Sequence, residues 1–489
     1  MSFQRDLALQ QLDLLNRSSV AYQLARYALT LDYTRLPPDV VHQAKRSLLD
    51  TLGCALGGHE APGRPICEEV ARELGGPDEA TVIGSGMRTS AHNATLVNSF
   101  MVRFLDYNDH GGGGHNSDSI PAILAVAERE HTDGRDFLTS VVISYELGAR
   151  VVESFTGKKL DLGWGGDIRG MLSMPCALGR LMGLNEDQIA NAIGSCACGN
   201  FTLGLLDADR EEFSMRKNLR FGAISCAAIL YCMLAKKGFT GPIRVIEGEF
   251  GWRQVLAQGE MDLERIVDFS GWRMRQVWHK SVPMNGSSAA HVLATLAIVK
   301  EQDLRPEDIA AVRITTSRRE ACHTTALAKR YPRNAETADH SAHYLNAIAI
   351  KDRTCGLNTI EPEKFTDPIV LDLIEKITVV GDKDPRFHHN EGTSQITTKD
   401  GRVFENHIVW PHGYGESRLS DEEIEVKFKE MASKYMDSRQ IRKIIDTAWN
   451  AEKLDDMGEL MKLMVFPPYR SPATPGEIPD GLNEKTEGR

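Results

Sequence analysis

Apolar residues recur at helical spacing through the first half of the chain. Between residues 37 and 58 they lie three or four positions apart, at Val40, Val41, Ala44, Leu48, Leu49 and Leu52. This spacing places them along one face of a helix. The same pattern predicts further helices over residues 118–130, 137–152, 171–182, 186–196 and 221–237. Small residues are frequent in these stretches, which favours closely packed helices.

The pattern changes after about residue 260. Residues 310–316 and 376–380 alternate and are rich in β-branched side chains, which predicts two strands. Two further alternating runs, 395–398 and 403–409, flank Asp400-Gly401, a pair typical of a hairpin turn. Helical spacing occurs between the strands over 291–300 and 341–350. Helix returns at Ser420, where Ser420-Asp421-Glu422-Glu423 fits a capping box.

The predicted fold class is therefore mainly α, with the chain divided into four parts. We expect helices in residues 1–265, a smaller α+β region in 266–415 and a return to helix in 416–469. Residues 470–489 are rich in proline, glycine and charge, and we expect them to form a loose tail.

The amino-acid composition of the chain argues against some classes of binding partner. The 489 residues carry a net charge of −11, which argues against nucleic acid or an anionic membrane surface as the partner. No uninterrupted apolar run approaches the ~20 residues that a membrane span needs, so we expect no integral membrane protein. The first residues lack the apolar core of a signal peptide, so we expect a cytoplasmic location.

The nine cysteines are expected to be reduced core residues, because their number is odd and they are scattered through apolar segments. The only tight pair is Cys196-Ala197-Cys198. A lone pair of this kind is weak support for zinc or an iron–sulfur cluster. We interpret it as helix packing, with metal binding as the minor alternative.

The densest group of chemically active residues is residues 106–117. Asp106, His110 and His115 flank or enclose four consecutive glycines, 111–114. Four glycines are costly inside a helix or strand, so the chain must leave regular structure here. A solvated surface loop is the alternative, but the density of titratable groups favours a ligand site.

A second group, Lys217 and Arg220, lies at the start of the helix predicted for 221–237. Cations oppose the helix dipole at this end, but they are well suited to binding a carboxylate with help from backbone N–H groups. The alternative, given equal weight, is a salt-bridge network with the acidic residues just upstream, which are Asp207, Asp209, Glu211 and Glu212.

Two more groups lie in the second half. Tyr344 follows His340 and His343 at a predicted helix start, and it fits either a proton donor or a core residue. Residues 278–288 include His279, Ser287 and Ser288 and lie where the helical and α+β regions join. Such residues can line a cleft or form a solvated linker.

Several motifs are absent from the sequence: the Walker A loop, G-x-G-x-x-G after a strand, G-x-S-x-G and H-E-x-x-H. Nucleotide hydrolysis, nicotinamide redox chemistry and serine-type acyl transfer are therefore disfavoured.

In their order along the chain, these groups resemble the MmgE/PrpD family, which includes 2-methylcitrate dehydratase, cis-aconitate decarboxylase and iminodisuccinate epimerase. The matching pieces are residues 44–53, 98–109, 115–118, 215–222, 238–242 and 336–344. No single motif is specific for this family. The collinear order of the motifs, from roughly residue 20 to 465, is specific for it.

The resemblance implies a large helical domain made from both ends of the chain, a smaller α+β lid, and an active site between them. It also implies a homodimer that acts on a small di- or tricarboxylate without a metal or organic cofactor. By position, Asp106 and His115 match the family's acidic and histidine site residues, Lys217 its cleft lysine and Tyr344 its lid tyrosine.

The chain also departs from the family. Residues 163–167 lack a histidine that many relatives carry, and the segment after Pro283 offers Asn285, Ser287 and Ser288 instead of another. His279 or His291 is a candidate replacement. These departures concern the substrate and the reaction type more than the fold.

We expect Asp106, His110, His115, Lys217 and Tyr344 to form the catalytic group, with substrate contacts from Arg220, Asn108, Ser287, Ser288 and His279. In this hypothesis a histidine moves the proton next to a substrate carboxylate, since its ordinary pKa lies near ~6.5. Dehydration of a 2-methylcitrate-like acid is the leading reaction. Decarboxylation, epimerisation and a catalytically inactive binding protein remain alternatives.

Overall fold

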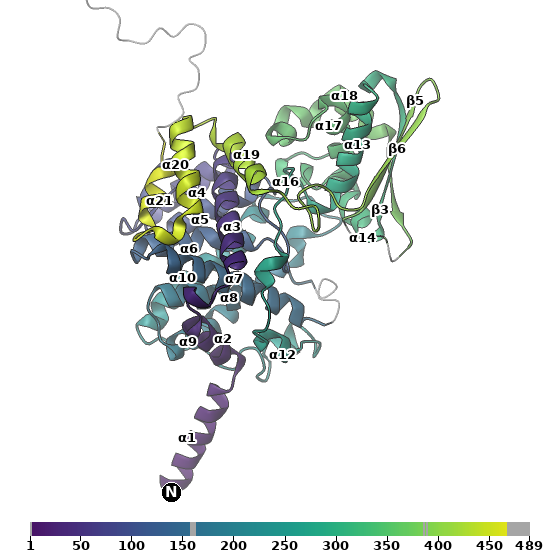
Figure 1. Cartoon of the computed structure of the whole chain (residues 1–489). Coiled ribbons are helices and arrows are strands. Elements are labelled where there is room, and N and C mark those ends of the chain that lie inside the picture. The colour runs from purple at the N-terminus through teal and green to yellow at the C-terminus, as the bar shows by residue number, and fades with distance from the viewer. Residues whose placement is uncertain (1, 157–162, 385–386, 388–389, 467–489) are drawn as a thin grey trace, which may run out of the picture.

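Most elements of the protein are helices, which confirms the mainly α fold class (Figure 1). The computed structural model describes residues 2–156, 163–384, 387 and 390–466. The predicted loose tail, 470–489, lies outside these residues.

The first half of the chain forms a helical body. Its α-helices are α1 (Ser2–Arg17), α2 (Val20–Thr30), α3 (Pro38–Gly57), α4 (Gly63–Leu74), α5 (Ala91–Phe104), α6 (Ile120–Arg129), α7 (Gly134–Ser154), α8 (Gly170–Leu181), α9 (Glu186–Ala197), α10 (Arg220–Lys236), α11 (Trp252–Val255) and α12 (Leu263–Val267). Helices α3, α6, α7, α8, α9 and α10 lie at the predicted positions, with ends that differ by a few residues. A two-stranded hairpin, β1 (Ala80–Thr81) and β2 (Arg88–Thr89), packs beside α5 and α6.

Helix α10 runs through this body. Together with the preceding 3-10 turn it forms a stretch, Met215–Lys236, whose length and composition would suit a membrane span. More than half of that stretch is buried inside the protein, and buried core helices pass the same test. The expectation of no membrane partner stays a prediction.

The α+β region is built on a four-stranded sheet in the order β4-β3-β5-β6. The strands are β3 (Ile309–Ser317), β4 (Ile377–Asp382), β5 (Gly392–Thr398) and β6 (Val403–Ile408). Strands β5 and β6 form the predicted hairpin, with Gly401 at φ 89° in its turn. Strands β3 and β4 pair in parallel, which requires the long crossover that separates them in the sequence.

The helices of this region cover the sheet and connect its strands. They are α13 (Ala289–Glu301), α14 (Arg318–Thr324), α15 (Leu327–Arg330), α16 (Ala335–Ala338), α17 (Ala342–Asp352) and α18 (Pro368–Lys376). Helix α13 packs against β5 and β6, α18 packs against β3 and β4, and α17 lies against both helices.

The chain then returns to the helical body with α19 (Asp421–Ala432), α20 (Ser438–Trp449) and α21 (Gly458–Leu463), drawn in yellow beside α3–α6 in Figure 1. Ser420 and Glu423 make the predicted capping box. Lys427 of α19 pairs with Asp50 of α3 at 2.6 Å, so residues from both ends of the chain meet in one core. The boundaries drawn at 265, 415 and 469 stay predictions.

Candidate active site

The glycine run forms a tight loop between α5 and α6. All four glycines have positive φ angles, between 53° and 147°. A Cβ on Gly111 would lie 2.3 Å from the carbonyl oxygen of Gln276, and one on Gly113 would lie 2.9 Å from the Val152 side chain. Only glycine fits these positions without strain, so the loop can press against its neighbours and hold His115 in place.

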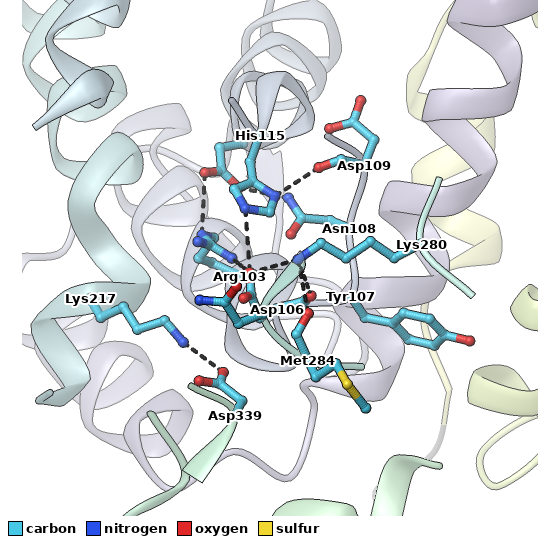
Figure 2. Close-up of polar contacts among 12 residues, drawn as sticks. Arg103, Asp106, Tyr107, Asn108, Asp109, His115, Lys217, Lys280, Met284 and Asp339 are labelled. Carbon is cyan, nitrogen blue, oxygen red and sulfur yellow. Dashed lines mark hydrogen bonds and ion pairs between the residues drawn. The ribbon is translucent and has the colours of Figure 1, made fainter. Parts of the chain in front are cut away.

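Asp106 begins this loop and lies at its charged centre (Figure 2). Its side chain is 2% exposed, and its backbone adopts a positive φ of 47°. The carboxylate pairs with Arg103, and its Oδ1 lies 3.1 Å from Lys280 Nζ and 3.4 Å from His115 Nε2. Burial opposes the charge, but the cations around it, Arg103 first, hold the pKa of Asp106 well below its usual range.

His115 has one ring nitrogen fixed as a donor. Its Nδ1 lies 2.7 Å from the backbone carbonyl of Asp109, which can only accept a hydrogen bond. Nδ1 therefore carries the proton in the neutral ring, and Nε2 presents a lone pair beside Asp106. Burial, and then Arg103 and Lys280, lower the pKa of His115 well below its usual value. The ring is thus a neutral base at physiological pH.

Lys280 completes this group, and the sequence analysis did not assign it a role. The amine donates to the carbonyl oxygens of Asp106 at 2.6 Å and Met284 at 3.1 Å. Its side chain is fully buried, and burial lowers the pKa of Lys280 to about 8. It lies within the segment 278–288, whose polar residues can line a cleft or form a solvated linker. This position is the feature of the sequence that could have indicated a role for Lys280. Arg103, the last basic residue of α5, was missed as well.

Lys217 approaches from the turn before α10. Its Nζ lies 2.6 Å from Asp339 Oδ2, and the side chain is 1% exposed. Asp339 Oδ1 in turn binds Nδ1 of His340, whose Nε2 lies 3.9 Å from Asp106 Oδ2. Burial raises the pKa of Asp339 to about 7, although Lys217 opposes this. The structure therefore brings Lys217 and His115 to one charged cluster (Figure 2).

Arg169 holds the glycine loop from the other side. Its guanidinium donates to the His115 carbonyl oxygen at 2.8 Å and to Asn116 Oδ1 at 3.2 Å. Arg169 lies two residues after the segment 163–167, which lacks a histidine. Its contacts fix the backbone that carries His115.

Two predicted substrate contacts bond to other residues of the protein. Arg220 pairs with Asp167 at 3.1 Å and Asp207 at 3.2 Å, which is the salt-bridge alternative for this residue. The Asn108 amide donates to Ser117 Oγ and to Asp118 Oδ1, both at 2.8 Å. Asn108 Oδ1 has no hydrogen-bond partner among the described residues, so a substrate contact from Asn108 stays a prediction.

Tyr344 does not contact the cluster in this arrangement, and its assignment as a catalytic residue stays a prediction. Its hydroxyl donates to the Thr359 carbonyl at 2.7 Å, and its ring packs edge-on against Phe365. Burial raises the pKa of this hydroxyl. Tyr344 is a core residue of the α+β region, because the buried face of α17 points into that region's own core.

The other candidate histidines lie at different positions relative to Asp106. His110 lies edge-on to His115, with ring centroids 4.9 Å apart, and its backbone pairs with that of Trp278. His279 Nε2 contacts Ser47 Oγ at 3.2 Å, which links it to the far side of Asp109 and not to Asp106. His291 is buried, and its Nδ1 contacts Asn346 at 2.9 Å, so a role for either histidine as a replacement for the missing histidines stays a prediction.

The two predicted serines lie close by. Ser287 is half-buried, and its backbone N–H binds Asn285 Oδ1 at 2.7 Å. Asn285 N–H binds the Asp339 carbonyl at 2.9 Å, so this turn abuts the cluster. Ser288 is fully buried, and its Oγ has no hydrogen-bond partner among the described residues.

The cluster can bind anions and move protons. Three cations, Arg103, Lys217 and Lys280, surround two carboxylates and a neutral imidazole. The same charges in water would be screened, but burial strengthens them here. Asp106 and His115 come from the helical body, whereas Lys280 and Asp339 come from the α+β side, so the group forms where the two regions meet.

Comparisons with known proteins show which family the chain belongs to. Residues 22–264 match the MmgE/PrpD N-terminal domain, and residues 283–451 match the MmgE/PrpD C-terminal domain. The chain is 25% identical to the cis-aconitate decarboxylase-like protein oryM of Aspergillus oryzae, over 91% of this chain and 97% of that protein. It is 24% identical to the cis-aconitate decarboxylase of Aspergillus terreus, over 92% and 97% of the two chains.

A further relative is the alkylcitrate dehydratase phiI of a fungal species, at 24% identity over 83% of this chain and 86% of that protein. These relatives are thus decarboxylases and a dehydratase by name, and their likeness spans almost their whole lengths. Since the two domain matches together cover most of the 489 residues, the chain belongs to the MmgE/PrpD family.

Proposed function

We propose that this protein is a lyase that dehydrates a small hydroxy-polycarboxylate of the 2-methylcitrate type. The observation that carries the proposal is the neutral His115 ring, whose Nε2 lone pair faces a buried cluster of Arg103, Lys280 and Asp106. A base beside cations is the arrangement needed to remove a proton next to a carboxylate, since the resulting negative charge requires stabilisation.

The cations supply substrate binding. Lys217 and Lys280 carry ammonium groups on opposite sides of Asp106, and Arg103 presents a planar guanidinium. Two or three carboxylates of a substrate can share these charges with Asp106 and Asp339. An acid of this size therefore matches the number of cations better than a neutral ligand does.

In the proposed step, His115 Nε2 takes the proton from the carbon next to a carboxylate. The electron pair of that C–H bond forms a C=C bond, and the neighbouring C–OH bond breaks. Lys280 gives its proton to the leaving hydroxyl, which departs as water. A pKa of about 8 suits this role, because the amine is protonated near neutral pH but releases its proton readily. Solvent then returns one proton from His115 to Lys280.

Access to the cluster requires movement of the α+β region. Asp106, Lys217 and Lys280 are each at most 2% exposed, so a polycarboxylate cannot reach them in this arrangement. The site residues come from both regions, and separating them would admit substrate and closing them would exclude water.

Decarboxylation of a cis-aconitate-like acid is the second candidate, favoured by the names of the A. oryzae and A. terreus relatives. There the C–C bond to a carboxylate breaks, CO₂ leaves, and the carbanion takes a proton from Lys280. The neutral state of His115 favours dehydration, because dehydration needs a base to remove a proton, whereas decarboxylation needs an acid to supply one.

The test is to incubate the purified protein with 2-methylcitrate, citrate and cis-aconitate in deuterated buffer and to follow the products by NMR. A product with a new C=C bond and loss of water supports the proposal, whereas loss of CO₂ supports the second candidate. Deuterium uptake without net change would indicate an epimerase, and binding without turnover a non-catalytic protein; either contradicts dehydration.

Two variants locate the chemistry. His115→Asn should lower kcat by a factor of about 10²–10⁴, the usual contribution of a positioned acid–base group. His131→Asn is the matched control, because His131 is a surface histidine that also contacts a carboxylate, Asp456. Equal activity in both variants would remove His115 from the mechanism.

A further inference from the structure

A second group of potential ligand atoms lies beside the active site. Asp207 ends a short 3-10 helix (Gly204–Asp207), His323 lies on α14, and His340 lies between α16 and α17. Asp207 Oδ1 is 3.7 Å from Nε2 of His323 and 3.7 Å from Nε2 of His340. All three ligand atoms lie within 4.8 Å of one another.

The outer contacts of both imidazoles fix which nitrogen faces Asp207. His323 Nδ1 lies 2.9 Å from Asp209 Oδ1, and His340 Nδ1 binds Asp339 Oδ1. An imidazole Nδ1 that faces a carboxylate is in the position of a donor, and the Asp339 carboxylate also pairs with Lys217. Each Nδ1 thus faces its own outer carboxylate, and each Nε2 faces Asp207.

The third atom is also electron-rich. Asp207 Oδ1 is buried and accepts no hydrogen bond from the residues that the structure describes. The other oxygen, Oδ2, pairs with Arg220 at 3.2 Å and so orients the carboxylate. Three potential ligand atoms thus converge with no hydrogen bond among them in the described part of the chain, an arrangement that a cation would stabilise.

We propose that Asp207, His323 and His340 bind one divalent transition-metal ion. Two imidazoles and a carboxylate suit zinc and similar ions, and three protein ligands leave a position for water or substrate. A carboxylate behind each ligating histidine is the usual outer-shell arrangement of such sites. Bonds of ~2.0–2.1 Å require ligand atoms roughly 3–3.5 Å apart, so a small closing movement suffices.

The charges nearby favour this place over the adjacent one. Asp106, Asp339 and His340 also lie close together, but Arg103, Lys280 and Lys217 already neutralise those carboxylates and would repel a cation.

Around Asp207, the cations Arg220 and Lys329 are matched by Asp167 and Asp209. The Lys329 amine lies against the Phe213 ring and donates to the His323 carbonyl, so it does not occupy the ligand cluster.

Such an ion would join the helical body to the α+β region, since Asp207 comes from the first and both histidines from the second. It departs from the metal-free chemistry that the family resemblance implies, and it is independent of the reaction proposed for His115. Binding measurements therefore test it without any assay of turnover.

The full chain is treated with a chelator, dialysed at mildly alkaline pH, and titrated with Zn²⁺ by calorimetry and with Co²⁺ by visible absorption. We expect one ion per chain. Asp207→Asn and His323→Ala should each weaken Zn²⁺ binding at least about 100-fold, and Asp209→Asn, which keeps all three ligands, by about 10–100-fold.

His131→Asn is the control, because it removes a surface histidine–aspartate pair of the same kind and should leave binding unchanged. Circular dichroism checks that each variant is folded, and the conservative Asp209→Asn variant keeps the test valid if His323→Ala does not fold. Absence of stoichiometric binding, or equal affinity in Asp207→Asn and the control, would overturn the proposal.

Discussion

Replacing Asp106 by asparagine should remove one buried negative charge and little else. Asparagine has nearly the same size, and it tolerates the positive φ of 47° at this position better than most residues do. The loop backbone is therefore expected to keep its course. The substitution isolates the electrostatic role of the carboxylate.

The expected loss of stability follows from the partners that remain. Arg103 keeps a second carboxylate, Asp118, 3.7 Å from its Nε, whereas Lys280 keeps only backbone carbonyls. Breaking a buried ion pair by removing one partner costs about 3–5 kcal/mol. We expect the free energy of unfolding near neutral pH to fall by that amount.

The loss should shrink at alkaline pH. The native pKa of Lys280 is about 8 because of burial, and Asp106 keeps it from falling further; in the unfolded chain a lysine titrates near ~10.4. Without Asp106 the native pKa falls below 8, and the amine loses its proton at lower pH. The unfolded state then binds more protons than the native state, so the variant gains stability as pH rises through this window.

Urea unfolding at about pH 7 and about pH 9 measures both effects. Asp39→Asn is the control, because Asp39 pairs with Arg275 at 2.6 Å on the exposed surface and should change stability little. A deficit for Asp106→Asn below about 1 kcal/mol at neutral pH, or one that does not shrink at alkaline pH, would refute this reasoning.

Three further predictions use other parts of the molecule. Tyr344→Phe should lower the free energy of unfolding by about 1–3 kcal/mol, because the buried Thr359 carbonyl loses its donor, while kcat stays unchanged; a large fall in kcat would place Tyr344 in the mechanism. Gly113→Ala should lower the melting temperature and kcat together, since φ is 99° and the new Cβ would lie 2.9 Å from Val152; an unaffected loop would contradict the packing described. Burial lowers the pKa of His291 to about 4, so its contribution to stability is complete above about pH 6.5 and lost as pH falls toward 4. His291→Gln should flatten that part of the pH dependence in urea unfolding, and an unchanged slope would count against it.

Locally encoded features of the fold could be predicted from the sequence. Ser420 and Glu423 cap α19 as expected, and Asp400-Gly401 turns β5 into β6. Each depends on a few neighbouring residues. The parallel pairing of β3 with β4 was not predicted, because it joins strands that are distant in the sequence.

The site was predicted in part for a similar reason. Asp106 and His115 stand out because four glycines adjoin them. Lys280 does not stand out, because nothing in its neighbours tells a buried amine from a solvated one. The sequence could not place Tyr344, because a helix tyrosine has the same local pattern whether its face points to the site or to its own core.

Completion of the site depends on Lys427, which is synthesised later than the residues it contacts. Its amine binds the carbonyl oxygens of Tyr107 at 2.7 Å and Lys280 at 2.9 Å, and so ties the glycine loop to the entrance of the α+β region. A growing chain exposes the loop and Lys280 long before residue 427 leaves the ribosome. Until α19 has docked, neither carbonyl has this donor, so we expect the glycine loop to reach its final position only after residue 427 is in place.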